Sequence, residues 1–372
     1  MGVLYQFGII ITRTNKLRSP NFKFINNSLS YCTSSSPPSH PSPQNHRSRT
    51  PLEKQFESWI HKLKPGFTPQ DVDDALRNQS DPDLALDIFR WTSNQRHYRH
   101  TDLTYYTMLR ILASENRFKQ IETLIAEVMA GACSPSPPLF NTIINHFCKR
   151  KLLGQAIDAF KKMQRDPNCK LTLQTYTMIL NSVLQKFTKL NVSCIYLHTV
   201  RSLVRQMKAT GIVPDTFTLN LVIKAYSKCL EMDEAIRVFK EMVLYGCEPD
   251  AYTYNYISKG LCEKGRVSQG LKFFREMREK GFVPSSSAFM IVICSLALER
   301  RFDEAIEVLF DMLGNSMVPD FLTYKTVLEG LGREGREKQA YELLEELKKK
   351  EGLMDLKTYS SLLNCLHLLD AE

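Results

Sequence analysis

The sequence repeats itself every 35 residues between positions 210 and 330. A Pro-Asp or Pro-Ser pair closes each repeat and begins at Pro214, Pro249, Pro284 and Pro319. Glycine or serine stands three positions before each of these prolines, and methionine stands seven positions before. A period of this length is typical of arrays in which each small unit buries its apolar face only against its neighbours. The chain is therefore predicted to fold as a stacked array and not around one central core.

Two apolar stripes at helical spacing divide each unit into two helices. In residues 251–285 the first stripe comprises Tyr254, Ile257, Ser258 and Leu261, and the second comprises Leu271, Phe274 and Met277. Gly265 separates the stripes, and Gly281 followed by Pro284 suits the end of the second helix. Tyr254 and its counterparts Phe289 and Tyr324 are interpreted as core residues. The sequence thus predicts an all-α solenoid of stacked 35-residue helical hairpins.

Extending this frame in both directions divides residues 102–355 into seven units. The units are 102–136, 137–172, 173–215, 216–250, 251–285, 286–320 and 321–355. Unit 173–215 is longer than the others, and we expect its surplus, around Lys186 to Ser193, to lengthen the loop between its helices. Residues 51–101 are expected to form N-terminal capping helices with a degenerate repeat, and 356–372 a half-repeat that caps the other end.

The first 50 residues differ in composition from the rest of the chain. They contain six of the 49 basic residues and no acidic residue, and they include the Pro/Ser stretch 34–43. This composition is typical of an organellar transit peptide followed by a disordered linker, although a disordered tail alone would also explain it. The short apolar start with spaced arginines favours a mitochondrial over a plastid destination. Since the net charge of the chain is +9, most of the basic excess belongs to this segment.

The remaining composition excludes several classes of protein. No apolar run reaches the length of a membrane span, so no membrane insertion is expected. The ten cysteines are scattered without a CxxC pair, which favours thiols in a reducing compartment over disulfides or zinc. We expect neither a metal nor another cofactor.

The repeat itself resembles a known family. A 35-residue helical hairpin with Thr253-Tyr254-Asn255 near its start, Gly260-Leu261-Cys262 in its first helix and Pro284 near its end is similar to the pentatricopeptide repeat. The Trp/Leu-Gly/Tyr pattern of the tetratricopeptide repeat does not occur. Units of uniform length resemble the P-type subclass of plant organellar proteins. The resemblance implies a right-handed superhelix that binds single-stranded RNA, one base per repeat.

The resemblance also implies which residues would read the RNA bases. In this family the fifth and last residues of a repeat contact a base edge, and the second residue packs on the base face. Four pairs match this pattern: Asn141 with Thr172, Thr177 with Asp215, Asn220 with Asp250, and Asn255 with Ser285. They suggest, in that order, a pyrimidine, G, U and a pyrimidine, with Phe217 and Tyr252 as stacking side chains. An ordinary helix N-cap or an exposed polar residue is the alternative interpretation of Asn220 and Asp250.

Other positions match the family's pattern less closely. Lys149, Lys228 and Arg333 occupy the slot in which the family often places a phosphate contact. Three pairs indicate no clear base preference: Tyr106 with Ser136, Met290 with Asp320, and Lys325 with Asp355. Lys325 could contact a phosphate or could block a base.

The sequence leaves two functional hypotheses. The chain contains no deaminase-like HxE and CxxC pattern, no acidic cluster suited to a two-metal nuclease and no glycine-rich phosphate loop, so we expect no catalytic activity. One hypothesis is a monomeric organellar RNA-binding protein in transcript processing, stability or translation. The alternative is a non-catalytic helical scaffold that associates with the mitochondrial ribosome or another complex and binds protein or structured RNA.

Overall fold

The computed structural model of the chain describes residues 51–63, 66–187, 190–349 and 354–369. In these ranges the structure contains eighteen α-helices, one short 3-10 helix and no strand. The transit peptide and linker predicted for residues 1–50 lie outside the described residues.

The helices follow one another as hairpins. A single helix, α1 (Pro51–Lys62), comes before the hairpins. The first hairpin pairs α2 (Pro69–Arg77) with α3 (Pro82–Ser93). The next hairpins are α4 (Asp102–Ser114) with α5 (Phe118–Ala130), α6 (Pro137–Lys149) with α7 (Leu153–Arg165), and α8 (Leu173–Leu184) with α9 (Leu190–Ala209). They are followed by α10 (Thr216–Lys228) with α11 (Met232–Met242) and the 3-10 turn η1 (Val243–Tyr245), and by α12 (Ala251–Glu263) with α13 (Val267–Glu279). The last elements are α14 (Ser286–Leu298) with α15 (Phe302–Gly314), α16 (Phe321–Arg333) with α17 (Glu337–Lys349), and the single helix α18 (Leu356–Leu369).

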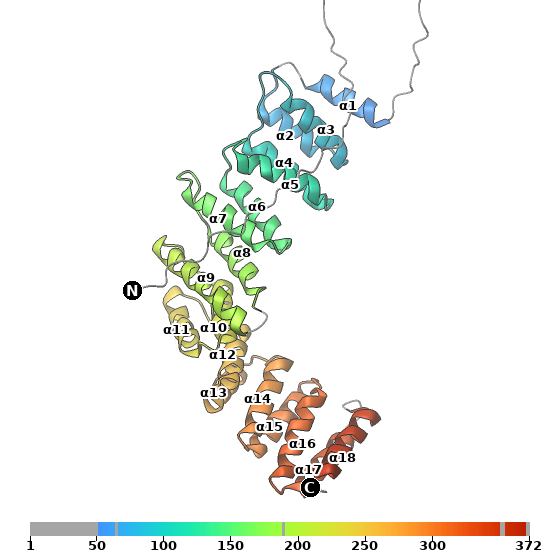
Figure 1. Cartoon of the computed structure of the whole chain (residues 1–372), viewed down its shortest axis with the longest axis vertical. Helices are drawn as coiled ribbons and strands as arrows, with labels where there is room; N and C mark the ends of the chain where they lie inside the picture. The colour runs from blue at the N-terminus through green and yellow to red at the C-terminus, as the bar shows by residue number, and fades with distance from the viewer. Residues whose placement is uncertain (1–50, 64–65, 188–189, 350–353, 370–372) are drawn as a thin grey trace, which may run out of the picture. The chain divides into compact units, whose positions relative to one another are not determined.

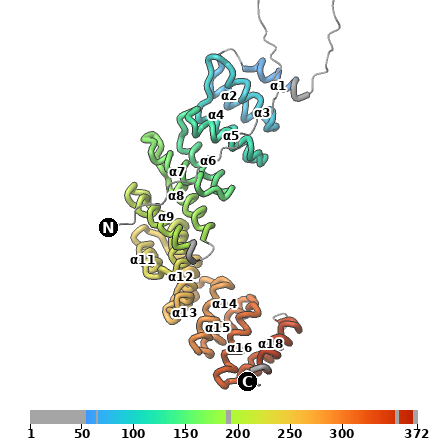
Figure 2. Tube along the Cα trace, in the orientation of Figure 1, coloured from blue at the N-terminus to red at the C-terminus, as the bar shows by residue number. Residues whose placement is uncertain are grey.

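Each hairpin packs against the next one in chain order (Figure 1). The first helices form one continuous layer, because α10 contacts α8 and α12, and α14 contacts α12 and α16. Each second helix packs against its own first helix, several also contact the first helix of the next unit, and the backbone trace shows the same succession (Figure 2). The all-α stacked fold predicted from the 35-residue period is therefore confirmed.

The residue columns that define the period also define where helices begin and end. Asp215, Asp250 and Asp320 are N-cap residues, and their carboxylates accept the backbone N–H groups three residues later at 2.8, 3.0 and 2.8 Å. Such a cap satisfies one of the N–H groups that a helix start leaves without a partner. Gly281 follows α13 with φ +79°, a left-handed conformation that glycine adopts without a steric penalty.

The predicted stripes form the core. Tyr254, Phe289 and Tyr324 are buried, and the ring of Phe274 meets that of Phe289 edge to face at 5.1 Å. Buried apolar side chains form two clusters along the stack, one from Val72 on α2 to Leu261 on α12 and one from Cys262 on α12 to Leu366 on α18. This distribution is what a stacked array requires, since each interface buries its own share of apolar surface.

One expectation about the long unit is wrong. The surplus of residues 173–215 does not mainly lengthen the loop, because α9 begins at Leu190 and runs for 20 residues, whereas α11 has 11 and α13 has 13. Residues 190–193, which the sequence analysis assigned to the loop, are the first turn of this helix. They contain no glycine or proline that would prevent helix formation.

The two ends of the stack are covered by single helices. At the start, α1 packs against α3, with Phe56 and Trp59 half-buried against the core. At the other end, α18 packs against α16 and α17 and buries Leu362. None of the helices in the described ranges has the length and apolar character needed to cross a membrane.

Candidate nucleic-acid interface

The layer of first helices brings the fifth residue of one unit close to the start of the next unit. The last residue of a unit is the N-cap of the following first helix: Thr172 precedes α8, Asp215 α10, Asp250 α12 and Ser285 α14. The N-cap interpretation is therefore correct for Asp250, and it is wrong for Asn220, which is buried within α10. Capping leaves Asp215 and Asp250 with a second carboxylate oxygen that does not bind the capped N–H group.

Asn220 and Asp250 are joined by a direct hydrogen bond. The Asn220 Nδ2 group donates to Asp250 Oδ1 at 2.9 Å, and the Thr253 hydroxyl donates to Asn220 Oδ1 at 2.6 Å. The same hydroxyl lies 3.0 Å from Asp250 Oδ1. Since Thr253 is fully buried, its hydroxyl fixes the orientation of the Asn220 amide. One N–H of Asn220 and the second oxygen of Asp250 take part in none of these bonds.

Asn255 and Ser285 also meet directly, but with the opposite use of the amide. The Asn255 Oδ1 atom accepts from the Ser285 backbone N–H at 2.9 Å and from its hydroxyl at 3.0 Å. The Asn255 Nδ2 group donates to the Ala251 carbonyl of its own helix at 2.6 Å. The difference from Asn220 has a local cause: Ala288 stands where Thr253 stands one unit earlier, so the third-position hydroxyl is missing and the Asn255 oxygen accepts from Ser285 instead.

The other two pairs are connected through a threonine and not directly. Thr175 donates to Asn141 Oδ1 at 2.7 Å and lies 3.0 Å from the Thr172 hydroxyl. The Thr177 hydroxyl lies 3.0 Å from that of Thr218, whose backbone N–H donates to Asp215 at 2.8 Å.

A threonine in the third position of a unit is therefore part of the interface, and the sequence analysis missed its role. The third-position threonines Thr104, Thr175, Thr218, Thr253 and Thr323 are all buried. Their recurrence in the 35-residue frame was the available signal. Their function became visible only from the contact between neighbouring units.

The predicted stacking residues are exposed. The side chains of Phe217 and Tyr252 are 57% and 65% accessible to solvent, an unusual state for large rings in a stacked array. The ring of Tyr252 lies 6.5 Å from that of Tyr256 at an angle of 30°, and Lys224 Nζ lies 5.4 Å from the Tyr256 ring. The aromatic surface thus extends to the half-buried Tyr256, which the sequence analysis did not identify.

The three predicted phosphate-binding side chains are all exposed, but their surroundings differ. Lys228 Nζ donates to the Phe187 carbonyl at 3.2 Å, and no carboxylate within the described ranges forms an ion pair with it. Arg333 lies 3.6 Å from Glu329, which also binds Lys325 at 3.4 Å, so one carboxylate offsets part of the charge of α16. Lys149 lies on the last turn of α6 beside Arg150 and His146.

Two further lysines stand closer to the base-reading pairs. Lys224 and Lys259 occupy the same slot in consecutive units, 35 residues apart. Lys259 Nζ donates to the Ser287 hydroxyl at 3.0 Å, and that hydroxyl lies 3.3 Å from Ser285. Burial, together with the nearby charges of Lys228 and Lys224, holds the pKa of Lys259 below its ordinary value, although Glu263 raises it. Lys224, Lys228 and Lys259 thus place three cations on α10 and α12, where two of the base-reading pairs begin.

Comparison with known proteins identifies the family. The signature described as the PPR repeat family matches residues 135–185, 214–263 and 319–367, and the one described as the PPR repeat matches 252–282 and 287–317. Together these segments cover more than half of the chain. The chain belongs to the pentatricopeptide-repeat family.

Two relatives from Arabidopsis thaliana are named as mitochondrial pentatricopeptide repeat-containing proteins. At3g25210 is 54% identical over 238 residues, which cover 62% of this chain and 63% of that protein. At2g27800 is 34% identical over 187 residues, which cover 50% of this chain and 42% of that protein. The chain thus spans less than two thirds of either relative. Their names bear out the mitochondrial assignment.

A solved structure supports the fold. The pentatricopeptide repeat protein PPR10, in complex with an 18-nt psaJ RNA element, is 21% identical with a TM-score of 0.50. The match covers 85% of this chain and 44% of PPR10.

The threonine network gives a testable prediction. Replacing Thr253 with valine keeps the shape of the side chain and removes the hydroxyl that contacts Asn220 and Asp250. The free energy of unfolding should fall by about 1–2 kcal/mol, because buried polar atoms lose their partner. Urea unfolding followed by circular dichroism measures the change. Thr253→Ser keeps the hydroxyl and should lose less; equal losses in both variants would show that the network contributes nothing.

Proposed function

We propose that this pentatricopeptide-repeat protein binds single-stranded RNA in mitochondria through its central repeats and acts there, without catalysis, in transcript processing, stability or translation. The observation that carries the proposal is the direct Asn220–Asp250 pair, which presents one N–H donor beside one carboxylate acceptor. The solved structure of PPR10 with RNA supports it through the shared fold. The seven units 102–136 to 321–355 are proposed as the repeats, of the P-type subclass.

The geometry of this pair suits the edge of a pyrimidine base. The Thr253 hydroxyl occupies Asn220 Oδ1, so the amide can offer only its remaining N–H. Asp250 can offer the oxygen that does not cap α12. Uracil presents a carbonyl acceptor beside its N3–H donor, which complements this donor and acceptor. A cation at the fifth position of a unit would compete with a base. Lys325 occupies that position in unit 321–355, and it is therefore not proposed to read a base.

The base faces would rest on the exposed second-position side chains. Phe217 and Tyr252 stand in consecutive units and are more than half accessible. Stacking of a base on an aromatic side chain contributes about 1–3 kcal/mol. Lys228, with Lys224 and Lys259, would attract the phosphates of the same strand.

Four pairs together would select a short tract. With Asn141 and Thr172 first, then Thr177 and Asp215, the tract is 5′-pyrimidine-G-U-pyrimidine-3′. Discrimination of about 1–3 kcal/mol per base over four bases is too small to single out one transcript. We therefore infer that protein partners contribute to the choice of transcript. A ribosome-associated scaffold is the second candidate function, because outer pairs such as Met290 with Asp320 do not combine a hydrogen-bond donor with an acceptor.

Selection from a random RNA pool tests the proposal. The full chain is incubated with random ten-nucleotide RNA, and the retained RNA is sequenced. Enrichment of the tract, with affinity that falls as salt rises, is expected because phosphate contacts release counterions. Binding without enrichment, or copurification with ribosomal particles and no binding to free RNA, would support the scaffold and refute base reading.

A further inference from the structure

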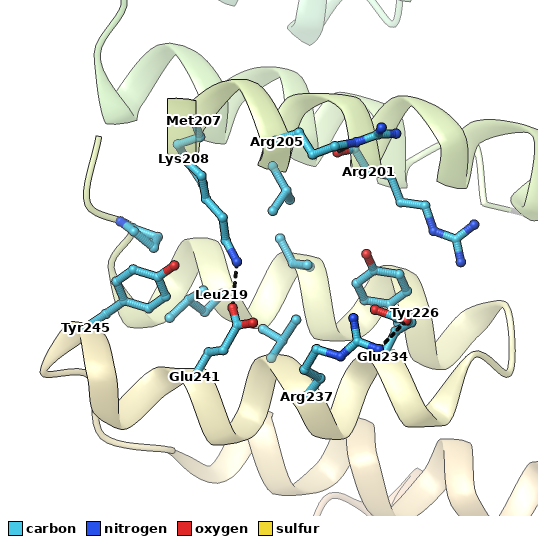
Figure 3. Close-up of a pocket in the computed structure, with 14 residues that line it drawn as sticks. Arg201, Arg205, Met207, Lys208, Leu219, Tyr226, Glu234, Arg237, Glu241 and Tyr245 are labelled. Atoms are coloured by element: carbon cyan, nitrogen blue, oxygen red, sulfur yellow. Dashed lines mark hydrogen bonds and ion pairs between the residues drawn. The ribbon is translucent and has the colours of Figure 1, made fainter. Parts of the chain in front are cut away.

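A cavity of about 340 Å³ lies between α9, α10 and α11, away from the base-reading residues (Figure 3). Its floor is apolar and includes Val204, Leu219 and Val238. None of the four base-reading pairs lines it. A volume of this size is in the range of sites that hold small organic ligands.

The cavity exists because three aromatic rings are missing at this junction. At the next junction along the chain, the ring of Phe239 packs on Tyr254 at 5.7 Å and on Phe273 at 5.4 Å, both edge to face. The residues 35 positions earlier in the frame are Val204, Leu219 and Val238, and all three line the cavity. Aliphatic side chains occupy less volume than rings, so the space that the rings fill in one junction is open in the other.

A glutamate at the cavity also lacks the partner that its counterpart has. The Tyr254 hydroxyl donates to Glu276 at 2.8 Å, and the Tyr105 hydroxyl donates to Glu127 at 3.1 Å. Glu241 is the counterpart of Glu276, but the side chain in the tyrosine's place is Leu219. Glu241 instead accepts from Lys208 of α9 at 2.8 Å. Glu241 therefore keeps the position of a carboxylate that accepts from a tyrosine hydroxyl, but Leu219 provides no such ring.

The rim of the cavity is basic. Arg201, Arg205 and Lys208 approach it from α9, and Arg237 approaches from α11 (Figure 3). Three of these four cations have a carboxylate partner. Glu241 binds Lys208 at 2.8 Å, and Glu234 binds Arg237 at 2.9 Å. Arg201 lies 3.4 Å from Glu231. Arg205 has no carboxylate partner in the described parts of the chain, and its Nε donates to the Arg201 carbonyl at 3.4 Å.

We propose that this cavity is a second binding site, for an aromatic anion: a planar ring that occupies the space above Leu219, and a phosphate or carboxylate that binds Arg205. An arginine fork suits either anion, since it can form two parallel charge-assisted hydrogen bonds. The anion is either a small molecule or the side chains of an acidic peptide that carries a tyrosine. The shared chemistry of the two sources is an aromatic ring close to a negatively charged phosphate or carboxylate group.

Binding of two probes to the full chain tests the proposal. Phenyl phosphate represents the small molecule, and the peptide acetyl-Glu-Tyr-Glu-amide represents the protein segment; calorimetry and saturation-transfer NMR measure both. Saturable binding of at least one probe is expected, and the probe that binds identifies the source. If neither probe binds saturably, the proposal is refuted.

Three variants locate the bound probe. Val204→Phe/Leu219→Tyr/Val238→Phe copies the rings of the next junction and should abolish binding, while RNA binding remains. Arg205→Glu, at an exposed position without an ion pair, should weaken binding about tenfold or more. Lys240→Ala removes an exposed charge from α11 outside the cavity and should have no effect. If the probe still binds to both the triple variant and Arg205→Glu, the probe binds elsewhere and the proposal is overturned. If the triple variant does not fold, the result for Arg205→Glu alone tests the proposal.

Discussion

Asn220→Thr is expected to change the base that the central repeats prefer from U to G. The variant converts the Asn220 and Asp250 pair into the combination found at Thr177 and Asp215, for which the resemblance suggests G. Asp250 still caps α12, so the fold should remain intact. The preference for U over G at this position should fall by about 10- to 100-fold, since one base contact contributes about 1–3 kcal/mol of discrimination.

Competition between two RNAs measures this change. The RNAs carry the proposed tract with U or G at the third position, and binding is followed by fluorescence anisotropy at fixed salt. Asn181→Thr makes the same substitution at an exposed site of α8 and should leave the preference unchanged. If Asn220→Thr retains the native preference, the pair does not read the base.

Phe274→Ala should destabilise the middle of the stack by about 3–5 kcal/mol. The ring is buried on α13 and packs edge to face on Phe289 of the following unit, so its removal weakens both one hairpin and one interface. In a linear array each unit is stabilised mainly by its neighbours. A weakened interface should therefore divide the cooperative unfolding into two steps.

Urea unfolding followed by circular dichroism tests this expectation. The transition of the variant should begin at lower denaturant and become broader or biphasic. Lys272→Ala, an exposed position on the same helix, should change the stability by less than about 0.5 kcal/mol. A single transition of native midpoint in Phe274→Ala would contradict the view that each interface contributes separately.

Different parts of the molecule follow from different levels of information. The helices and the core were predictable, because the spacing of Tyr254, Ile257 and Leu261 reflects a periodic local geometry. The length of α9 was not predictable. The sequence showed that unit 173–215 has additional residues, but not whether they belong to the helix or to the loop. The exposed rings Phe217 and Tyr252 were identified through the family pattern, but their neighbour Tyr256 was not.

The sequence by itself determined the repeat, the hairpin and the residue columns, because these depend on contacts within about one turn of helix and recur at a fixed interval. Only the tertiary structure decided how those columns interact. The partner of each asparagine oxygen depends on the start of the next first helix: Thr253 donates to Asn220, whereas Asn255 accepts from Ser285. Likewise, Val204 and Leu219 are ordinary apolar residues in their own helices, and they leave a cavity only because neighbouring units bring them together. Contacts between units bring together residues far apart in the sequence, such as Val204 with Leu219 and Asn220 with Thr253, so local periodicity does not specify their geometry.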